Sequence, residues 1–224
     1  MGQKVHPYGF RLGNTTSWKT NWYAEKKDYE INLVEDIKIS NSIDDMIKIA
    51  VLSNVSSYEI DRQRNTLCVK LYTDKVSLLI GKGGTNLAKV SNRLSRITGK
   101  KVLVDVKEIR TNSYADVALL SEMIAARISS GRGFKDIVKN CQEIVRSGEQ
   151  KTTKDSKTKV IGIKIGISGR INGAEIARSE SMSFGRIPLS SISTQIDYKC
   201  SHVTTQYGVI GLKIWIAKKQ KFYI

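Results

Sequence analysis

The spacing of apolar residues separates helical from extended stretches along the 224-residue chain. Apolar residues recur every three or four positions, which predicts amphipathic helices, in the stretches 43–50, 87–97, 117–128 and 137–145. They alternate with polar residues or glycine, which predicts strands with one buried face, in the stretches 161–167, 192–198 and 209–216. This pattern predicts an α+β protein with a mainly antiparallel sheet in its C-terminal part.

Residues 58–106 arrange short elements around one glycine-rich loop. Two predicted strands, 58–61 and 67–71, flank a polar turn, and a short helix with Asp74 as its expected N-cap follows. The loop Gly81–Gly84 comes next, before a helix that Gly99 is expected to end and a further strand. Glycines let the main chain approach a phosphate closely, and the following helix offers free N–H groups to an anion. In this context the G-x-x-G loop is typical of a KH module, which clamps a few nucleotides.

The G-x-x-G motif alone is weak. The chain has two more copies, Gly166–Gly169 and Gly208–Gly211, and both lie in strand-like alternation. A plain glycine-rich turn in a small α/β domain is therefore the alternative interpretation of the loop taken by itself.

Changes of composition divide the chain into four parts. Residues 1–27 lack periodicity and are expected to form an arm that folds against a partner. Residues 28–110 form the KH-like domain, and the helical segment 111–150 is expected to pack between the domains. Residues 151–224 form a basic α/β domain, and the polar stretch 149–159 is expected to be a linker or loop.

Basic residues outnumber acidic residues. Lys and Arg number 37 against 21 Asp and Glu, which gives a net charge of +16 and a pI near 9.8. Such a balance indicates a polyanionic partner. No apolar run reaches the length of a membrane span and no signal peptide is visible, so nucleic acid is favoured over a membrane.

Residues for metal binding or catalysis are sparse. The two histidines are isolated, and the three cysteines lack C-x-x-C spacing and are expected to be reduced thiols packed as small hydrophobes. The acidic residues of the C-terminal part show no metal-ligand spacing and are Asp155, Glu175, Glu180 and Asp197. We therefore expect no metal, no cofactor and no enzymatic activity.

Three blocks of sequence resemble one protein family. They are MGQKVHPYGFRLG at residues 1–13, SGRINGAEIAR at 168–178 and TTQYGVIGLKIWI at 204–216. In this order around a KH module, they closely resemble the ribosomal protein S-three family of the small subunit, bacterial type. Because three separate blocks must coincide, this resemblance is far more specific than the G-x-x-G loop.

The resemblance implies a type II KH domain followed by a C-terminal α/β domain. It further implies a structural role in the head of the small ribosomal subunit, bound to the rRNA of that subunit. Ribosomal proteins S-ten and S-fourteen would be neighbours, and with S-four and S-five the protein would surround the entrance of the mRNA channel. Neither a membrane nor a second copy of the chain is expected as a partner.

The loop and the resemblance together name the side chains expected to bind RNA. The expected RNA-binding residues are Lys4, His6, Arg11, Gly81, Lys82, Gly83, Gly84, Arg170, Arg178 and Arg186. The residues expected at the mRNA entrance are Arg132, Lys135 and Lys139.

Two departures from the family pattern change what is expected of these sites. Asp136 stands in a row that is usually denser in cations, and the stretch 181–189 lacks a Trp and one basic residue. An acid in that row is expected to weaken the hold on mRNA phosphates and so any role in unwinding mRNA.

The same blocks indicate the expected location of the protein and the alternative to its expected function. Residues 9–16 and 22–24 resemble cyanobacterial and plastid members, so a plastid ribosome is the expected location and the bacterial cytoplasm the alternative. The functional alternative is a free-standing KH-domain RNA-binding regulator, which would need neither the first block nor the basic C-terminal domain.

Overall fold

The chain folds into two compact units, each with its own four-stranded sheet and hydrophobic core. One unit comprises residues 18–109, and the other comprises residues 1–17 and 110–224. The computed structural model describes residues 3–48, 55–63, 66–109, 116–151 and 158–220.

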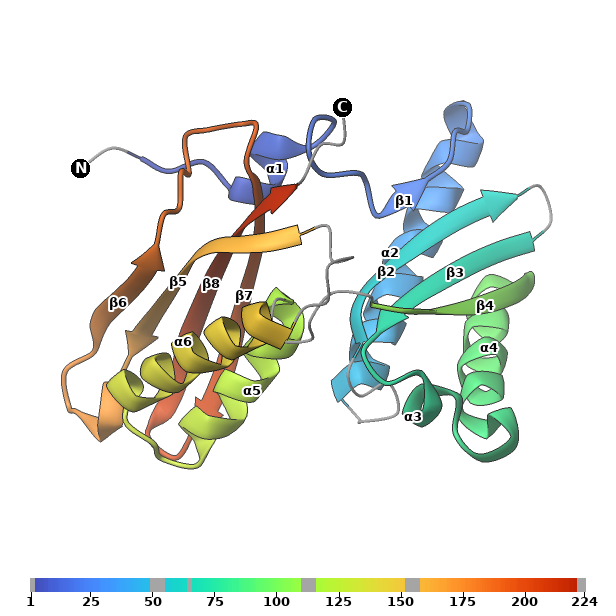
Figure 1. The fold of residues 1–224 in the computed structure, drawn as a ribbon. Coiled ribbons are helices and arrows are strands. Elements are labelled where there is room, and N and C mark those ends of the chain that lie inside the picture. Colours follow the sequence, from blue (N-terminus) through green and yellow to red (C-terminus); the bar gives the residue numbers. More distant parts are fainter. Residues whose placement is uncertain (1–2, 49–54, 64–65, 110–115, 152–157, 221–224) are drawn as a thin grey trace. The chain divides into compact units, whose positions relative to one another are not determined.

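The unit of residues 18–109 is built on a mixed sheet of order β1-β2-β3-β4 (Figure 1). Helix α2 (Lys26–Lys48) precedes the antiparallel pair β2 (Val55–Gln63) and β3 (Thr66–Thr73). Helices α3 (Val76–Ile80) and α4 (Thr85–Thr98) then lead to β4 (Lys101–Glu108), which pairs parallel with β3. A parallel neighbour requires such a crossover. The short strand β1 (Thr20–Asn21) pairs parallel with β2 at the other edge.

One face of this sheet carries the core of the unit. Alternation along β3 buries Leu67, Val69 and Leu71, which pack with apolar residues of α2 and α4. Helix α4 ends at Gly99 with φ of +65°, which confirms the predicted C-cap. The predicted N-cap of the preceding helix is wrong, because α3 begins at Val76 with Lys75 rather than Asp74 at the N-cap.

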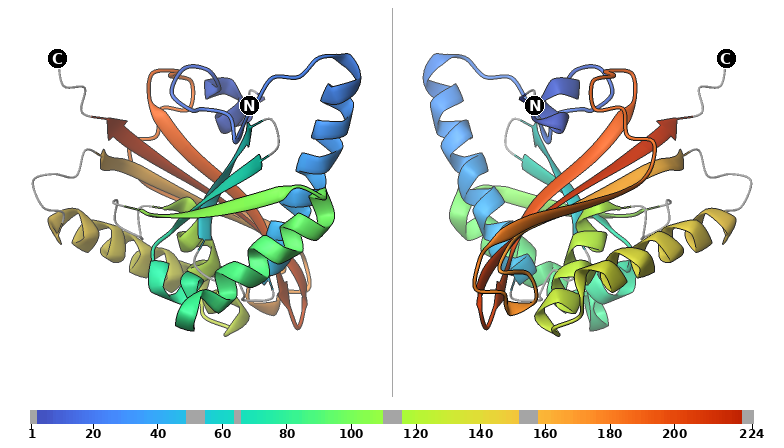
Figure 2. Two further views of the ribbon diagram at one scale, coloured as in Figure 1. Left: turned by 90° about the vertical axis from the view of Figure 1, so that its right-hand side faces the viewer. Right: turned by 90° about the vertical axis from the view of Figure 1, so that its left-hand side faces the viewer.

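The other unit carries a fully antiparallel sheet of order β6-β5-β8-β7, with two helices on one face (Figures 1 and 2). Its strands are β5 (Thr158–Gly169), β6 (Arg178–Gly185), β7 (Gln195–Thr205) and β8 (Gly208–Gln220). The helices are α5 (Val117–Ser129) and α6 (Phe134–Lys151). Their apolar sides share one core with alternate residues of β5 and β8, which confirms the periodicity predicted for 161–167 and 209–216. The strand predicted over 192–198 begins only at Gln195, and Ile192 is 45% exposed.

The helices predicted to lie between two domains belong to the core of this second unit. Leu120 and Ile124 of α5 and Ile137 of α6 are buried in one cluster with Ile165 and Ile214 of the sheet. An amphipathic helix buries its apolar stripe best on an open sheet face, and this sheet offers one. The predicted linker is also shorter than expected, because α6 reaches Lys151 and β5 begins at Thr158; residues 152–157 lie outside the described part.

The N-terminal residues pack on their own chain, which differs from the predicted arm of residues 1–27. Helix α1 (Pro7–Arg11) lies against β7, and His6 caps it by accepting a hydrogen bond from Gly9 N at Nδ1, 3.3 Å away. From Trp18 onward the chain belongs to the other unit, where Trp22 Nε1 donates to Asp36 at 2.6 Å. Trp22 thus finds a partner within the chain, whereas Trp18 and Tyr23 of the predicted arm are 61% and 87% exposed.

Candidate nucleic-acid interface

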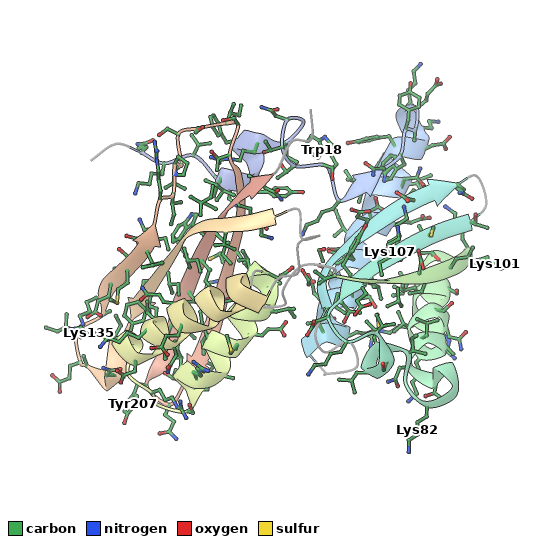
Figure 3. The ribbon with its side chains drawn as sticks, in the orientation of Figure 1. Trp18, Lys82, Lys101, Lys107, Lys135 and Tyr207 are labelled. Atoms are coloured by element: carbon green, nitrogen blue, oxygen red, sulfur yellow. The ribbon has the colours of Figure 1, made fainter. Side chains whose placement is uncertain are left out.

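The G-x-x-G loop has a backbone that favours glycine at three positions. Gly81, Gly83 and Gly84 have φ of +72°, +63° and +76°, values that residues with a side chain adopt rarely. A Cβ at Gly81 would also lie 2.8 Å from Asn86 Nδ2, so a side chain there would require Asn86 to shift. Asn86 in turn donates to Leu78 O at 3.3 Å and ties α4 to α3. These features define the shape of the loop, and Lys82 extends from it as an exposed side chain (Figure 3).

The surroundings of the loop suit a nucleotide chain. Gly84 is the N-cap of the 14-residue helix α4 and supplies no side-chain cap. Thr85 N donates to Lys82 O, and the following N–H groups of a first helical turn have no partner within the helix and can bind an anion. Leu78 and Ile80, both near the C-terminal end of α3, are 55% and 37% exposed. These two apolar side chains offer contacts for bases, and the sequence did not single out Leu78.

The edge strand β4 adds cations that sequence reasoning missed. Lys101 and Lys107 are exposed on this strand (Figure 3), as is Leu103. The signal was present in the sequence, because Val102, Val104 and Val106 alternate with these residues and share one face of the strand. Val102 is buried, so the intervening residues point to the open side.

Arg11 is a correction to the predicted RNA-binding set. Its side chain is fully buried, and its guanidinium donates to backbone carbonyl oxygens at 2.6–3.3 Å, those of Pro7, Pro188, Leu189, Ser191 and Thr194. Burial lowers the pKa of this guanidinium. Arg11 therefore holds α1 against the segment that leads into β7, and its donors are turned away from any phosphate.

Lys4 and His6 lie at the face of the C-terminal sheet that the two helices leave open. His6 meets Tyr198 edge-on with ring centroids 5.0 Å apart, and Tyr198 lies 5.3 Å from Trp215. Lys164 places its Nζ 5.4 Å from the Trp215 ring. Burial, and then the like charge of Lys4, lowers the pKa of Lys164. Two cations beside aromatic rings favour an anion between them.

Three predicted arginines of the C-terminal unit differ in what they bind. Arg170 donates to Ala174 O at 2.8 Å and to Tyr207 O at 3.4 Å, so it braces the turn Ile171–Gly173. Arg178 has a 57% exposed side chain and pairs with Glu180 at 3.0 Å. Arg186 is exposed beside the end of β6. Arg178 and Arg186 are therefore open to RNA, whereas Arg170 is partly engaged in the fold.

The residues predicted at the mRNA entrance come together where α5 meets α6. Arg132 lies in the connection, and Lys135 and Lys139 are exposed one turn apart on α6. Asp136 is exposed in the first turn, where a negative charge stabilises the helix N-terminus. The acid that interrupts the cation row thus has a structural use. This cluster and the Gly81–Gly84 loop belong to different units.

The described residues carry no cluster of three or more His, Cys, Asp or Glu side chains that could hold a metal ion. No described helix combines the length and apolar character needed to cross a membrane. The cysteines differ from one another: burial raises the pKa of Cys141 to about 11, whereas Cys200 is exposed. Cys141 fits the prediction of a small packed hydrophobe, and Cys200 does not.

Two family models match adjoining parts of the chain. Residues 38–113 match the KH domain, and residues 124–216 match the family described as ribosomal protein S3, C-terminal domain. Both matches agree with the two folds described above, and they confirm the predicted fold class.

Full-length relatives carry the same name. Small ribosomal subunit protein uS3 of Pelagibacter ubique (strain HTCC1062) is 39% identical over 225 residues, 99% of this chain and 92% of the relative. The protein of that name from Dictyoglomus turgidum (strain DSM 6724 / Z-1310) is 40% identical over 97% of this chain and 84% of the relative. That of Clostridium botulinum (strain Hall / ATCC 3502 / NCTC 13319 / Type A) is 39% identical over 97% of this chain and 92% of the relative.

Proposed function

Because the chain belongs to the family of small ribosomal subunit protein uS3, we propose that it is a structural, non-catalytic component of the small ribosomal subunit that binds rRNA. The observation that carries the proposal is 39% identity over 99% of the chain, which spans both the KH domain and the C-terminal domain. A free-standing KH-domain regulator is the disfavoured alternative, because it would need no C-terminal domain of the ribosomal type.

In this proposal, exposed and partly exposed cations of the C-terminal unit neutralise rRNA phosphates. Arg178, Arg186 and the pair Lys4 and Lys164 supply them, with His6 and its neighbouring rings at the same open sheet face. Phosphate contacts release counterions, so the affinity falls steeply as salt rises. The loop Gly81–Gly84, with Lys82 at its tip, adds a backbone contact to a single strand.

The finer placement is also a proposal. We place the protein in the subunit head, with ribosomal proteins S-ten and S-fourteen as neighbours and S-four and S-five close by. Arg132, Lys135 and Lys139 then line the entrance of the mRNA channel. Support comes from their common exposure at one corner of the C-terminal unit, where a passing strand would meet several cations at once.

The proposed location is the ribosome of a plastid. It rests on the likeness of residues 9–16 and 22–24 to cyanobacterial and plastid members of the family. The relatives named above come from bacteria, and a bacterial cytoplasm is the alternative location.

Co-sedimentation tests the proposed function. The full chain, expressed with a tag in cells of its source or a related bacterium, is expected to migrate with small subunits through a sucrose gradient of high salt. A chain found only with free mRNA would overturn the proposal in favour of the KH regulator. Incubation of the purified chain with labelled RNA, with and without Mg²⁺, is expected to give no cleavage.

A further inference from the structure

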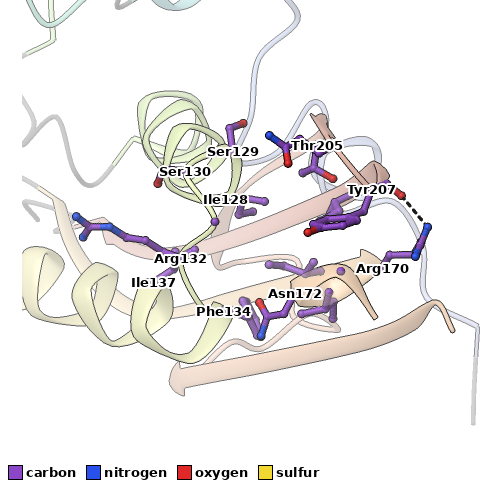
Figure 4. A pocket seen from close by; sticks show the side chains of 16 residues that line it. Ile128, Ser129, Ser130, Arg132, Phe134, Ile137, Arg170, Asn172, Thr205 and Tyr207 are labelled. Atoms are coloured by element: carbon purple, nitrogen blue, oxygen red, sulfur yellow. Dashed lines mark hydrogen bonds between the residues drawn. The ribbon is translucent and has the colours of Figure 1, made fainter. Parts of the chain in front are cut away.

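A pocket of about 380 Å³ opens at the corner of the C-terminal unit where α5 turns into α6. Its other walls are the turn Ile171–Gly173 and the connection between β7 and β8 (Figure 4). Its floor is apolar and consists of Ile128, Phe134, Ile137, Ile167, Ile171 and Ile210. This volume lies in the range of pockets that hold a small ligand.

An aromatic ring stands at the rim of this pocket. Tyr207 is 56% exposed, and its ring packs over Gly173, where a Cβ would approach to within 3.0 Å of Tyr207 Cε2. Arg170 fixes the same turn through Tyr207 O, at 3.4 Å. Arg170 Cζ also lies over this ring, 5.9 Å from its centroid, so the turn holds the ring in place next to the apolar floor while its exposed part is open to a planar ligand (Figure 4).

Cations flank the pocket. Arg132 and Arg170 line it on opposite sides (Figure 4), and Lys135 follows Arg132 on the first turn of α6. Asp136 is the acid of that turn, so the rim is net positive. An apolar floor, an aromatic wall and a positive rim together select a ligand with a flat apolar ring and an attached negative charge.

We propose that this pocket holds one unstacked base of single-stranded RNA, with the flanking phosphates on the cations of its rim. The inference rests on the proposed function and deepens it by naming the unit of RNA that this corner recognises. Base–aromatic stacking tolerates any sequence, as a strand of variable sequence requires. The apolar side chain of a basic protein neighbour is the other possible occupant, and the positive rim disfavours it.

The test compares strands with and without bases. Binding of the purified full chain to a fluorescent oligouridylate is measured against an abasic strand of equal length and charge. Tyr207→Ala is expected to weaken binding of oligouridylate about tenfold, the loss of one stacked base, and to leave abasic binding unchanged. Tyr207→Phe is expected to retain the wild-type affinity. Tyr23→Ala is the matched control, since Tyr23 is 87% exposed in the other unit.

The outcomes separate this inference from the proposed function. Equal affinity of Tyr207→Ala and wild type for oligouridylate overturns the pocket inference, and co-sedimentation of both with small subunits would leave the proposed function standing. A protein occupant would give a different result: the variant would bind RNA as the wild type does, and mass spectrometry would show that its subunits lack one ribosomal protein. That result overturns the pocket inference. Loss of co-sedimentation by the wild-type chain overturns the function itself.

Discussion

Each unit of the chain buries an arginine, but the two units satisfy its charge with different groups. Arg62 of β2 binds carboxylates of α2, Asp36 at 2.5 Å and Glu35 at 2.7 Å, where the three side chains are only 8%, 8% and 17% exposed. Arg11 of α1 instead donates to backbone carbonyl oxygens of its own unit. The first arrangement cancels a positive charge inside the unit, and the second leaves it uncancelled.

The difference shows why net charge overstates the cations that RNA can reach. Arg62 and Lys100 both bind Glu35, and the two cations outweigh the effect of burial, so the pKa of Glu35 is lowered. Arg62 contributes to the +16 of the chain although its side chain is only 8% exposed. Lys135, Lys139 and Arg178 differ, because they are exposed. The number of cations available to RNA therefore depends on where each cation lies in the fold, and the net charge alone does not give it.

The largest effect is expected from Arg62→Ala. Removal of the guanidinium leaves the buried carboxylate of Asp36 without its cation, while Glu35 keeps only Lys100, and the loss costs about 3–5 kcal/mol. Hydrogen exchange followed by mass spectrometry is expected to show faster exchange across residues 18–109 and little change in the other unit. The measurement must report on each unit separately, because a single unfolding midpoint would combine the stabilities of both units.

Arg93→Ala is the matched control for this variant. Arg93 is exposed on α4 of the same unit, and its removal is expected to change the free energy of unfolding by no more than about 0.5 kcal/mol. If Arg62→Ala were as mild as Arg93→Ala, the charge cancellation described for this unit would contribute little to its stability.

Arg11→Ala is expected to have the second largest effect. The carbonyl oxygens of residues 188–194 would lose a charged donor in a buried site, at a cost of about 2–3 kcal/mol. Exchange is expected to rise in residues 3–17 and in the segment before β7, and the loop Gly81–Gly84 is expected to stay protected. Arg186→Ala serves as the control in the same unit, because Arg186 is exposed. Weaker RNA binding by Arg11→Ala without any change in exchange would restore Arg11 to the RNA-binding set.

Periodicity sufficed to predict most elements of the fold, because it reports local burial. The helix ending at Gly99 and the strands that bury Ile163 and Ile214 lie where their spacing placed them. Periodicity could not assign α5 and α6 to a unit, because the apolar stripe of a helix does not determine which sheet the helix covers. Only the fold shows that they share a core with β5 and β8.

The candidate site was predictable to a similar degree. Glycine spacing identified the Gly81–Gly84 loop, because positive φ is a local requirement. Sequence blocks could not separate Arg11 from Arg178, since burial of a cation depends on carbonyl groups more than 170 positions away along the chain, as with Thr194. The pocket beside Tyr207 was missed for the same reason, because its walls come from separate elements.

The smallest effect on stability, with a clear effect on function, is expected from Lys135→Glu combined with Lys139→Glu. Both residues are exposed, so the free energy of unfolding should change by no more than about 0.5 kcal/mol. Loss of two phosphate contacts should reduce the slope of log affinity against log salt for single-stranded RNA by about 1.4. Reconstituted subunits are expected to assemble normally and to unwind structured mRNA more slowly.

Asp136→Asn sharpens this prediction in the opposite direction. It removes the negative charge from the cation row, so RNA affinity should rise, while the first turn of α6 loses a favourable dipole interaction of about 0.5 kcal/mol. Opposite signs for affinity and stability at one residue would show that the acid supports the helix at the expense of RNA binding. If neither the double variant nor Asp136→Asn changed unwinding, this corner would act through the pocket beside Tyr207 alone, and exposure would not be a sufficient sign of a functional cation.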